Sequence, residues 1–466
     1  MAFRGWRVVN AVGALATSSA LLIVLGFGYG SIPALGRALV PGGGVWRAAD
    51  AEPTARDQRL HLSGLSRPVT VSFTAEGYVE ITAETDGDLF LAQGYVTATF
   101  RLTEMDLQRR AGRGRLAQLN GRSQLESDRF ELRLGIERTA EAQWAATPPE
   151  SAAGQALLAY ARGVNARLAE LTASGQWPEI YGLTGVYPEP WTPVDSLVVQ
   201  GIMTQLLSFT TTPLDYALLD QSLGPQRTRD WFPVQAPTEL SQQPFDTGPY
   251  QSLHPEAMAT ANANASVVPV DQVVDPPGER IHEMDGESIA PAATSILSTV
   301  RGLPTSRQKI HPNSNAWAVN GPTLSGGLAM LAGDPHLPTS LPSVWFEVSL
   351  RSPAYRVVGA SLPGMPAVVL GHNEHISWSI TNAENQSTLF YTEQTDIRHP
   401  NAYYWRGTWR SMQQVNYTIP VRGGDAENLT VNLTVHGPIL TVSGQTVSVT
   451  WMGNYPSPSL ESLLSV

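Results

Sequence analysis

The chain has 466 residues, of which 42% are apolar and 15% charged, with 41 glycines and 35 prolines. This composition is typical of a loop-rich globular protein, and it excludes a coiled coil and a largely disordered chain. The net charge of −11 repels phosphate backbones, and no basic stripe with interleaved aromatics occurs, so we expect no nucleic-acid partner. The absence of cysteine excludes disulfides, a thiol nucleophile and thiolate metal sites.

Residues 1–36 predict a membrane-directed segment. Arg4 and Arg7 precede an uncharged run from Val8 to Gly36, which is long enough to span a bilayer. Because no clean small-residue cleavage site follows the run, we expect an uncleaved anchor in the cell membrane, with most of the chain extracytoplasmic. A cleaved signal, leaving a secreted or periplasmic protein, is the alternative.

Residues 37–233 read as a mostly helical region. An alternating stretch at 69–85 predicts strands with a turn, and a helix is expected over 94–119. Ser127 is expected to cap a second helix, and Thr192, with Pro193 and Asp195, a later one. A further helix is predicted by an amphipathic stripe at Leu157, Ala161, Val164, Leu168 and Leu171.

Composition divides the second half of the chain at Ser314. Residues 234–313 are rich in Pro, Ser, Ala, Gln and Asn with little periodicity, so we expect a linker that is a candidate for excision. Residues 314–466 form short β-rich runs separated by Gly and Pro. Helices followed by strands predict an α+β fold with layered sheets.

Ser314 lies where the linker ends and the first of these strands begins. If the bond between Asn313 and Ser314 is cut, Ser314 gains a free α-amino group, and such groups have a pKa of about 7.7 to 8.0. That amine can accept the proton of the adjacent hydroxyl, directly or through a water, without a histidine. The cut can be autocatalytic, because the hydroxyl can attack the preceding carbonyl to form an ester that water hydrolyses.

Motifs on both sides of the linker resemble those of a known family. SNAWAVNG, LAGDPHLPTSLPSVWFEVSLR and VVGASLPGMPAVVLGHNEHISWSITN are similar to the start of the β-subunit of the penicillin acylases, which are N-terminal-nucleophile (Ntn) amidohydrolases. GYVTATFRLTEMDLQRRAGRGRLAQLNG, LESDRF and YPEPWTPVDS are similar to the α-subunit. The resemblance covers about residues 90–466 except the linker. It implies an Ntn-hydrolase αββα layered sandwich with a helical α-subunit region.

The resemblance also implies site residues. Ser314 would be the nucleophile, and His336 would contact the nucleophile and its amine. Asn382 would supply a backbone N–H to the oxyanion hole, which stabilises the charge that develops on the carbonyl oxygen. An apolar acyl group would enter a pocket, for which Trp345 and Phe346 are candidate lining residues.

Other combinations of polar residues predict different chemistry. His372, Glu374 and His375 suggest a metal cluster, but histidines three apart in a strand point to opposite faces, which disfavours it. His372 with Asn373 matches a family pair that braces the strand. A Ser–His–Asp relay from Asp334, His336 and another serine lacks the elbow motif of such relays. We expect no metal and no other cofactor.

Three departures from the family pattern set further expectations. Asn313 stands where the family usually has Gly or Thr, so self-cleavage is expected to be slower. Gln386, Leu389 and Pro213 occupy the neighbourhood of the family's calcium carboxylates, so we expect no calcium. The family's β-subunit extends well beyond the length that follows Ser314 here, so its later oxyanion Asn and later Arg are expected to be missing from a truncated sandwich.

The resulting interpretation is an amidohydrolase for a small N-acyl substrate, such as a penicillin or an acyl-homoserine lactone. The partners expected are the substrate, the membrane at the N-terminal helix, and the α and β fragments of one precursor. An inactive or truncated relative that acts as a scaffold or binding protein is the rival interpretation. A lipid-surface binding protein, suggested by the anchor alone, is the third.

Overall fold

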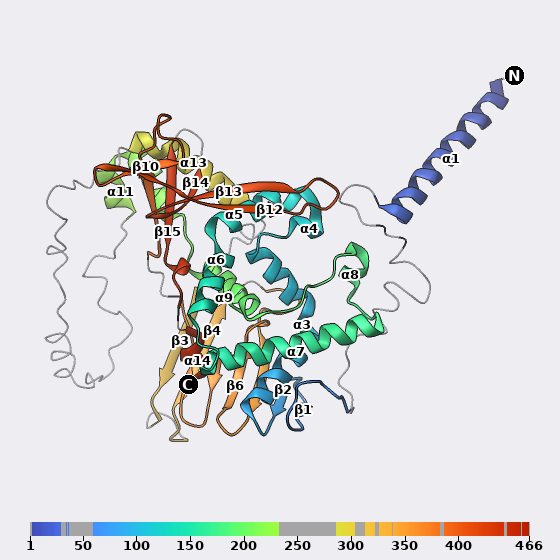
Figure 1. Ribbon diagram of the computed structural model, residues 1–466, viewed down its shortest axis with the longest axis vertical. Coiled ribbons are helices and arrows are strands. Elements are labelled where there is room, and N and C mark those ends of the chain that lie inside the picture. The colour runs from blue at the N-terminus through green and yellow to red at the C-terminus, as the bar shows by residue number, and fades with distance from the viewer. Residues whose placement is uncertain are drawn as a thin grey trace.

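The computed structural model describes residues 2–28, 34, 36, 59–232, 286–302, 313–321, 326–337, 339–382, 386–441, 445–457 and 459–465. Among them, helices dominate up to 302 and strands dominate from 313 (Figure 1). The predicted α+β class is therefore confirmed. The helices are α1 (Ala2–Phe27), α3 (Asp86–Gly112), α4 (Ala117–Asn120), α5 (Leu125–Leu134), α6 (Ile136–Ala146), α7 (Ala152–Ser174), α8 (Glu179–Thr184), α9 (Pro193–Ser208), α10 (Thr212–Leu223), α11 (Pro225–Trp231), α13 (Gly286–Gly302) and α14 (Ser459–Leu464).

The strands form two larger sheets and two hairpins. The six-stranded sheet has the order β1-β2-β5-β6-β7-β8, and the five-stranded sheet has the order β12-β13-β14-β15-β9. Strands β3 with β4, and β10 with β11, pair as separate hairpins. Their bounds are β1 (Thr70–Phe73), β2 (Val79–Thr82), β3 (Asn313–Val319), β4 (Met330–His336), β5 (Phe346–Arg351), β6 (Arg356–Ser361), β7 (Val368–His372), β8 (Ser377–Trp378), β9 (Thr388–Glu393), β10 (Ala402–Trp405), β11 (Thr408–Ser411), β12 (Gln413–Ile419), β13 (Glu427–Thr434), β14 (Gly437–Thr441) and β15 (Thr446–Trp451).

A layer of helices lies between the two larger sheets (Figure 1). The six-stranded sheet packs on α3 through one apolar cluster that includes Ile81, Val96 and Val348. The five-stranded sheet packs on α5 through a second cluster, and on α10 and α13 through a third. Within the described residues each larger sheet therefore packs on helices, and the expected αββα stack, with sheet against sheet, is not seen there.

The helical predictions are partly right. The stripe from Leu157 to Leu171 is buried in α7, and α9 opens with Thr192 and Asp195 in a reciprocal capping box, as predicted. The helix expected over 94–119 instead begins at Asp86, because the Thr85 side chain accepts the Asp88 N–H, and ends at Gly112. The predicted cap at Ser127 is wrong. Ser127 lies inside α5, and left-handed Gly135 separates α5 from α6.

The predicted linker contains a folded helix. Most of 234–313 lies outside the described residues, but α13 packs Ala293, Ile296 and Leu297 against Leu214 and Val449. Apolar residues three and four apart give α13 a buried face, which a composition-based prediction overlooks. Within the described residues of the predicted linker, α13 is therefore packed into the fold.

Candidate active site

Ser314 lies at the start of the β3–β4 hairpin. In the antiparallel register Ser314 is opposite Pro335, Asn313 is opposite His336, and Ala316 is opposite Gly333. Residues opposite each other in such a pair project to one face, and alternate residues project to opposite faces. The Ser314 side chain therefore shares a face with Ala316 and Gly333.

The side chain of His336 lies on the opposite face of this hairpin from the Ser314 hydroxyl. His336 is opposite Asn313 in the register, and its Nε2 is 3.0 Å from Oδ2 of Asp334, two residues earlier on the same strand. Both side chains are exposed. The His–Asp pair of the alternative relay is therefore formed, but on the intact chain it does not face Ser314.

The segment that carries Asn382 lies against the face of Ser314. Asn382 follows β8, and Ser379 in the same segment sits over Gly333, because a Cβ built on Gly333 would lie 2.6 Å from the Ser379 Cβ. Since Gly333 and Ser314 project to the same face, the structure brings Ser379, three residues before the oxyanion candidate Asn382, to the side of the hairpin on which the Ser314 side chain lies. Neither Gly333 nor Ser379 was singled out from the sequence; a small residue in a strand was the available signal.

The residues of the alternative metal cluster are occupied otherwise. Glu374 pairs with Arg356 at 2.9 Å, and His372 Nδ1 lies 3.3 Å from the carbonyl oxygen of its neighbour Asn373. Asn373 itself braces the turn, since its side-chain oxygen accepts the N–H groups of His375 and Ile376. In the described part of the chain no group of three His, Asp or Glu residues could hold a metal ion.

Comparison with known proteins places the chain in a family. A family model described as penicillin amidase matches residues 68–466, which is most of the chain. The chain belongs to the penicillin amidase family. Solved structures of a thermostable penicillin G acylase from Alcaligenes faecalis give TM-scores of 0.23 at 27% identity, covering 24% of this chain and 20% of that chain, and 0.32 at 23% identity, covering 37% and 94%.

Curated relatives are considerably longer than this penicillin amidase family member. The acyl-homoserine lactone acylase QuiP of Pseudomonas aeruginosa is 29% identical over 81% of this chain and 41% of its own length. Penicillin acylase 2 proenzyme of Pseudomonas sp. strain SE83 is 28% identical over 82% of this chain and 44% of its own length. Penicillin G acylase of Escherichia coli is 27% identical over 78% of this chain and 44% of its own length. The chain thus spans less than half of the length of these relatives.

The positions compared with the family's calcium site lie beside residues that join two segments by hydrogen bonds. Pro213 is in the first turn of α10, and Leu389 is exposed in β9. Next to them the Thr210 N–H donates to Oγ1 of Thr388 at 3.2 Å, and the Ser387 hydroxyl donates to the carbonyl oxygen of Ser208. Hydrogen bonds within the protein therefore link the end of α9 to β9.

Phe346, a candidate for the acyl pocket, packs in the core. Phe346 is buried against α3, stacked on Phe100 with 6.5 Å between ring centroids, and Arg101 lies over its ring. The alternation of β5 turns Phe346, Val348 and Leu350 toward α3. Phe346 is thus a core residue between β5 and α3, and its role in an acyl pocket stays a prediction.

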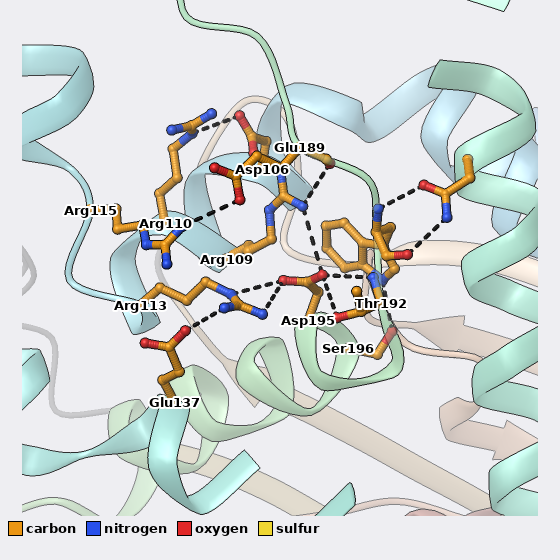
Figure 2. Close-up of polar contacts among 12 residues, drawn as sticks. Asp106, Arg109, Arg110, Arg113, Arg115, Glu137, Glu189, Thr192, Asp195 and Ser196 are labelled. Carbon is orange, nitrogen blue, oxygen red and sulfur yellow. Dashed lines mark hydrogen bonds and ion pairs between the residues drawn. The ribbon is translucent and has the colours of Figure 1, made fainter. Parts of the chain in front are cut away.

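A buried network of charges fixes α9 to α3 (Figure 2). Asp106 accepts hydrogen bonds from Arg109 at 2.5 Å and Arg110 at 2.9 Å, and all three side chains are buried. Asp195, the capping residue of α9, accepts from Arg113 at 2.9 Å. Because charges this deeply buried must be paired, the network holds α9 in a defined position against α3.

Proposed function

We propose that this chain is an amidohydrolase of the penicillin acylase type that acts through Ser314. The α-amine of Ser314 takes the proton of its own hydroxyl, and Oγ attacks the carbonyl carbon of the substrate amide. The backbone N–H of Asn382 stabilises the negative charge on the carbonyl oxygen. The leaving amine takes the proton, and water then hydrolyses the ester to release the carboxylic acid and restore the hydroxyl.

The same hydroxyl is proposed to release its own amine. Oγ of Ser314 attacks the carbonyl carbon of Asn313, the C–N bond breaks, and water hydrolyses the resulting ester to leave a carboxylate on Asn313. The proton that the Ser314 hydroxyl gives up in this attack must reach the nitrogen of Ser314 as the C–N bond breaks. His336, which the register places opposite Asn313, is the proposed donor, with Asp334 orienting its ring.

One observation carries this proposal. Strand β3 begins one residue before Ser314 and directs the Ser314 side chain to the face on which Ser379, three residues before Asn382, lies. A nucleophile and an oxyanion donor must converge on one carbonyl group, so a shared face is the first geometric requirement. The family membership and the names of the relatives supply the reaction class.

A denaturing gel of purified protein tests the cut. We expect two bands, with the smaller fragment starting at Ser314, and both the cut and amidase activity lost in Ser314→Ala. His336→Ala should slow the cut by at least about tenfold, since a positioned proton donor contributes roughly 10²–10⁴-fold. A single intact band after long incubation would reject the proposal.

The proposed substrates are N-acylated small molecules with an apolar acyl group. The names of the relatives mention penicillins and acyl-homoserine lactones, and we propose both as candidates. Release of the free amine from a penicillin and from an N-acyl-homoserine lactone, measured side by side, distinguishes them. Failure to hydrolyse either by cut protein would remove both.

A non-catalytic scaffold is the second candidate function. It is favoured by the register of the β3–β4 hairpin, which puts the side chains of Ser314 and His336 on opposite faces. A scaffold predicts that Ser314→Ala behaves as the wild type in every assay, whereas the enzyme predicts loss of the cut.

We propose that α1 holds the protein in a membrane. Trp6–Phe27 is apolar enough to span a bilayer, with a mean hydropathy of 2.1, although a signal sequence passes the same test. The chain should sediment with membranes after a high-salt wash, and deletion of residues 2–28 should release it.

We also propose that the cut needs no calcium. A chelator should leave the rate of the cut unchanged; a slower cut would reject the calcium-free proposal.

A further inference from the structure

Ser379 and Gly333 make a contact that the proposed mechanism does not yet use. The Ser379 side chain occupies the space in which the Cβ of any other residue at position 333 would lie. A Cβ built there would overlap the Ser379 Oγ and would lie 2.6 Å from the Ser379 Cβ. The Cα of Ser379 would lie 3.8 Å from the same built Cβ, so the overlap is with the side chain of Ser379. Only glycine at 333 therefore allows the strand and this segment to approach so closely.

Two neighbouring side chains hold the segment that leads to Asn382. Ser379 packs against Gly333 of β4, and Trp378 packs against the six-stranded sheet. The Trp378 indole N–H donates to the carbonyl oxygen of Val369 at 3.1 Å, and its ring packs on the cluster between α3 and the six-stranded sheet. Ser379 projects the other way, toward β4. Asn382 follows three residues later, a span of at most about 10 Å.

The contact depends on shape rather than on a hydrogen bond. The Ser379 Oγ is buried and has no hydrogen-bond partner among the described residues. Its Cβ and Oγ nevertheless fill the space over Gly333. Removing only the oxygen should therefore keep most of the contact, whereas removing the whole side chain should abolish it.

We propose that the contact between Gly333 and Ser379 positions the backbone N–H of Asn382 relative to Ser314, so that this N–H stabilises the charge on the carbonyl oxygen of Asn313 during the cut as it does on the substrate. Gly333 and Ser379 are then positioning residues, and the inference rests on the proposed function of Ser314 and Asn382. A displacement of about 1 Å in a catalytic group can lower a rate by about 10²-fold, so a shift of this segment should slow the chemistry.

A size exchange across the contact tests the proposal in the full chain. Gly333→Ala crowds the contact and Ser379→Gly empties it, and each should slow the cut before Ser314 by about tenfold or more. The double variant Gly333→Ala with Ser379→Gly moves the methyl group to the other side and should restore the rate to within a few-fold of wild type. Ser379→Ala is the matched control and should cleave almost as fast as wild type.

The outcomes separate this inference from the proposed function. The thermal unfolding temperature of each variant is measured alongside the rate, because a folding defect lowers both, whereas a positioning defect lowers the rate alone. If wild type is cut and both single variants are cut equally fast, the inference is wrong and the proposed function stands. A slow Ser379→Ala, or a double variant that folds but stays slow, also overturns the inference. An uncut wild type rejects the proposed function and the inference with it.

Discussion

Glu131 is a carboxyl group that α5 buries without a cation. Its side chain is 2% exposed, Gln205 Nε2 donates to one oxygen at 3.1 Å, and the other oxygen has no hydrogen-bond partner among the described residues. Burial raises the pKa of Glu131 from 4.5 to about 8. The folded protein therefore holds this proton more tightly than the unfolded chain does.

The raised pKa of Glu131 predicts that the free energy of unfolding falls as the pH rises. Its contribution to the free energy of unfolding is fully present below about pH 4.5 and is lost as the pH rises through about 8. Glu131→Gln keeps the size of the side chain and its ability to form hydrogen bonds, but removes the charge. It should therefore stabilise the protein at pH 8 by on the order of 2 kcal/mol and have little effect at pH 5. Denaturant unfolding at both pH values measures this.

The exposed Glu126 on the same helix provides the matched control. Glu126→Gln should change stability equally little at pH 5 and pH 8. A Glu131→Gln variant with the same pH dependence as the wild type would contradict the assignment.

At the residue scale, the sequence supplied candidate residues for the chemistry but did not show on which face of a strand each side chain lies. Ser314 and His336 were expected to meet, yet a register in which Ser314 opposes Pro335 separates their side chains. A one-residue difference in register reverses every face of a strand, and the turn that sets the register cannot be read from propensity. Gly333 has no side chain to attract attention, so its contact with Ser379 became visible only in three dimensions.

At the scale of elements, α9 depends on one carboxylate for both its cap and its charge balance. Asp195 accepts the Thr192 N–H at 2.7 Å and pairs with Arg113 at 2.9 Å and with Arg109 at 3.7 Å (Figure 2). Asp195→Ala leaves buried guanidinium charges without this partner, which should cost about 3–5 kcal/mol of stability. Glu189→Ala removes the exposed carboxylate of the same region and should cost less than about 0.5 kcal/mol.

Chemical denaturation of the two variants compares these costs. Equal effects of Asp195→Ala and Glu189→Ala would show that the buried network does not fix α9.

The capping box of α9 was predictable because its signal is local, three residues apart. Helix α13 was missed because its burial depends on β9 and β15, more than 80 residues away in the chain.

At the scale of the whole molecule, both sides of the proposed cut share one core. Strand β2 pairs in parallel with β5, and the N–H of Gly364 donates to the Tyr160 hydroxyl at 3.0 Å. Arg138 donates to the Tyr417 hydroxyl at 2.6 Å, and the largest apolar cluster includes Leu157 and Trp451. The fragments 1–313 and 314–466 are therefore held together by buried contacts rather than by one peptide bond.

The two fragments should remain associated after the cut. In size-exclusion chromatography at high salt they should elute as one species, because apolar contacts are not screened by ions. They should separate only when a denaturant is added. Separation in native buffer would contradict this account of the core.

The α+β class was predictable because helices and strands each follow local periodicity. The stacking of the layers was not, because the parallel pairing of β2 with β5 joins residues about 270 apart in the chain. Which face of each sheet is covered depends on such long-range pairs. The family match, rather than periodicity, supplied the reaction class.

The most direct test is the N-terminal sequence of the smaller fragment in protein that hydrolyses an N-acyl substrate. The account predicts that this fragment begins Ser-Asn-Ala-Trp and that activity rises in proportion to its amount. Amide hydrolysis by protein in which Asn313 is still bonded to Ser314 would contradict it.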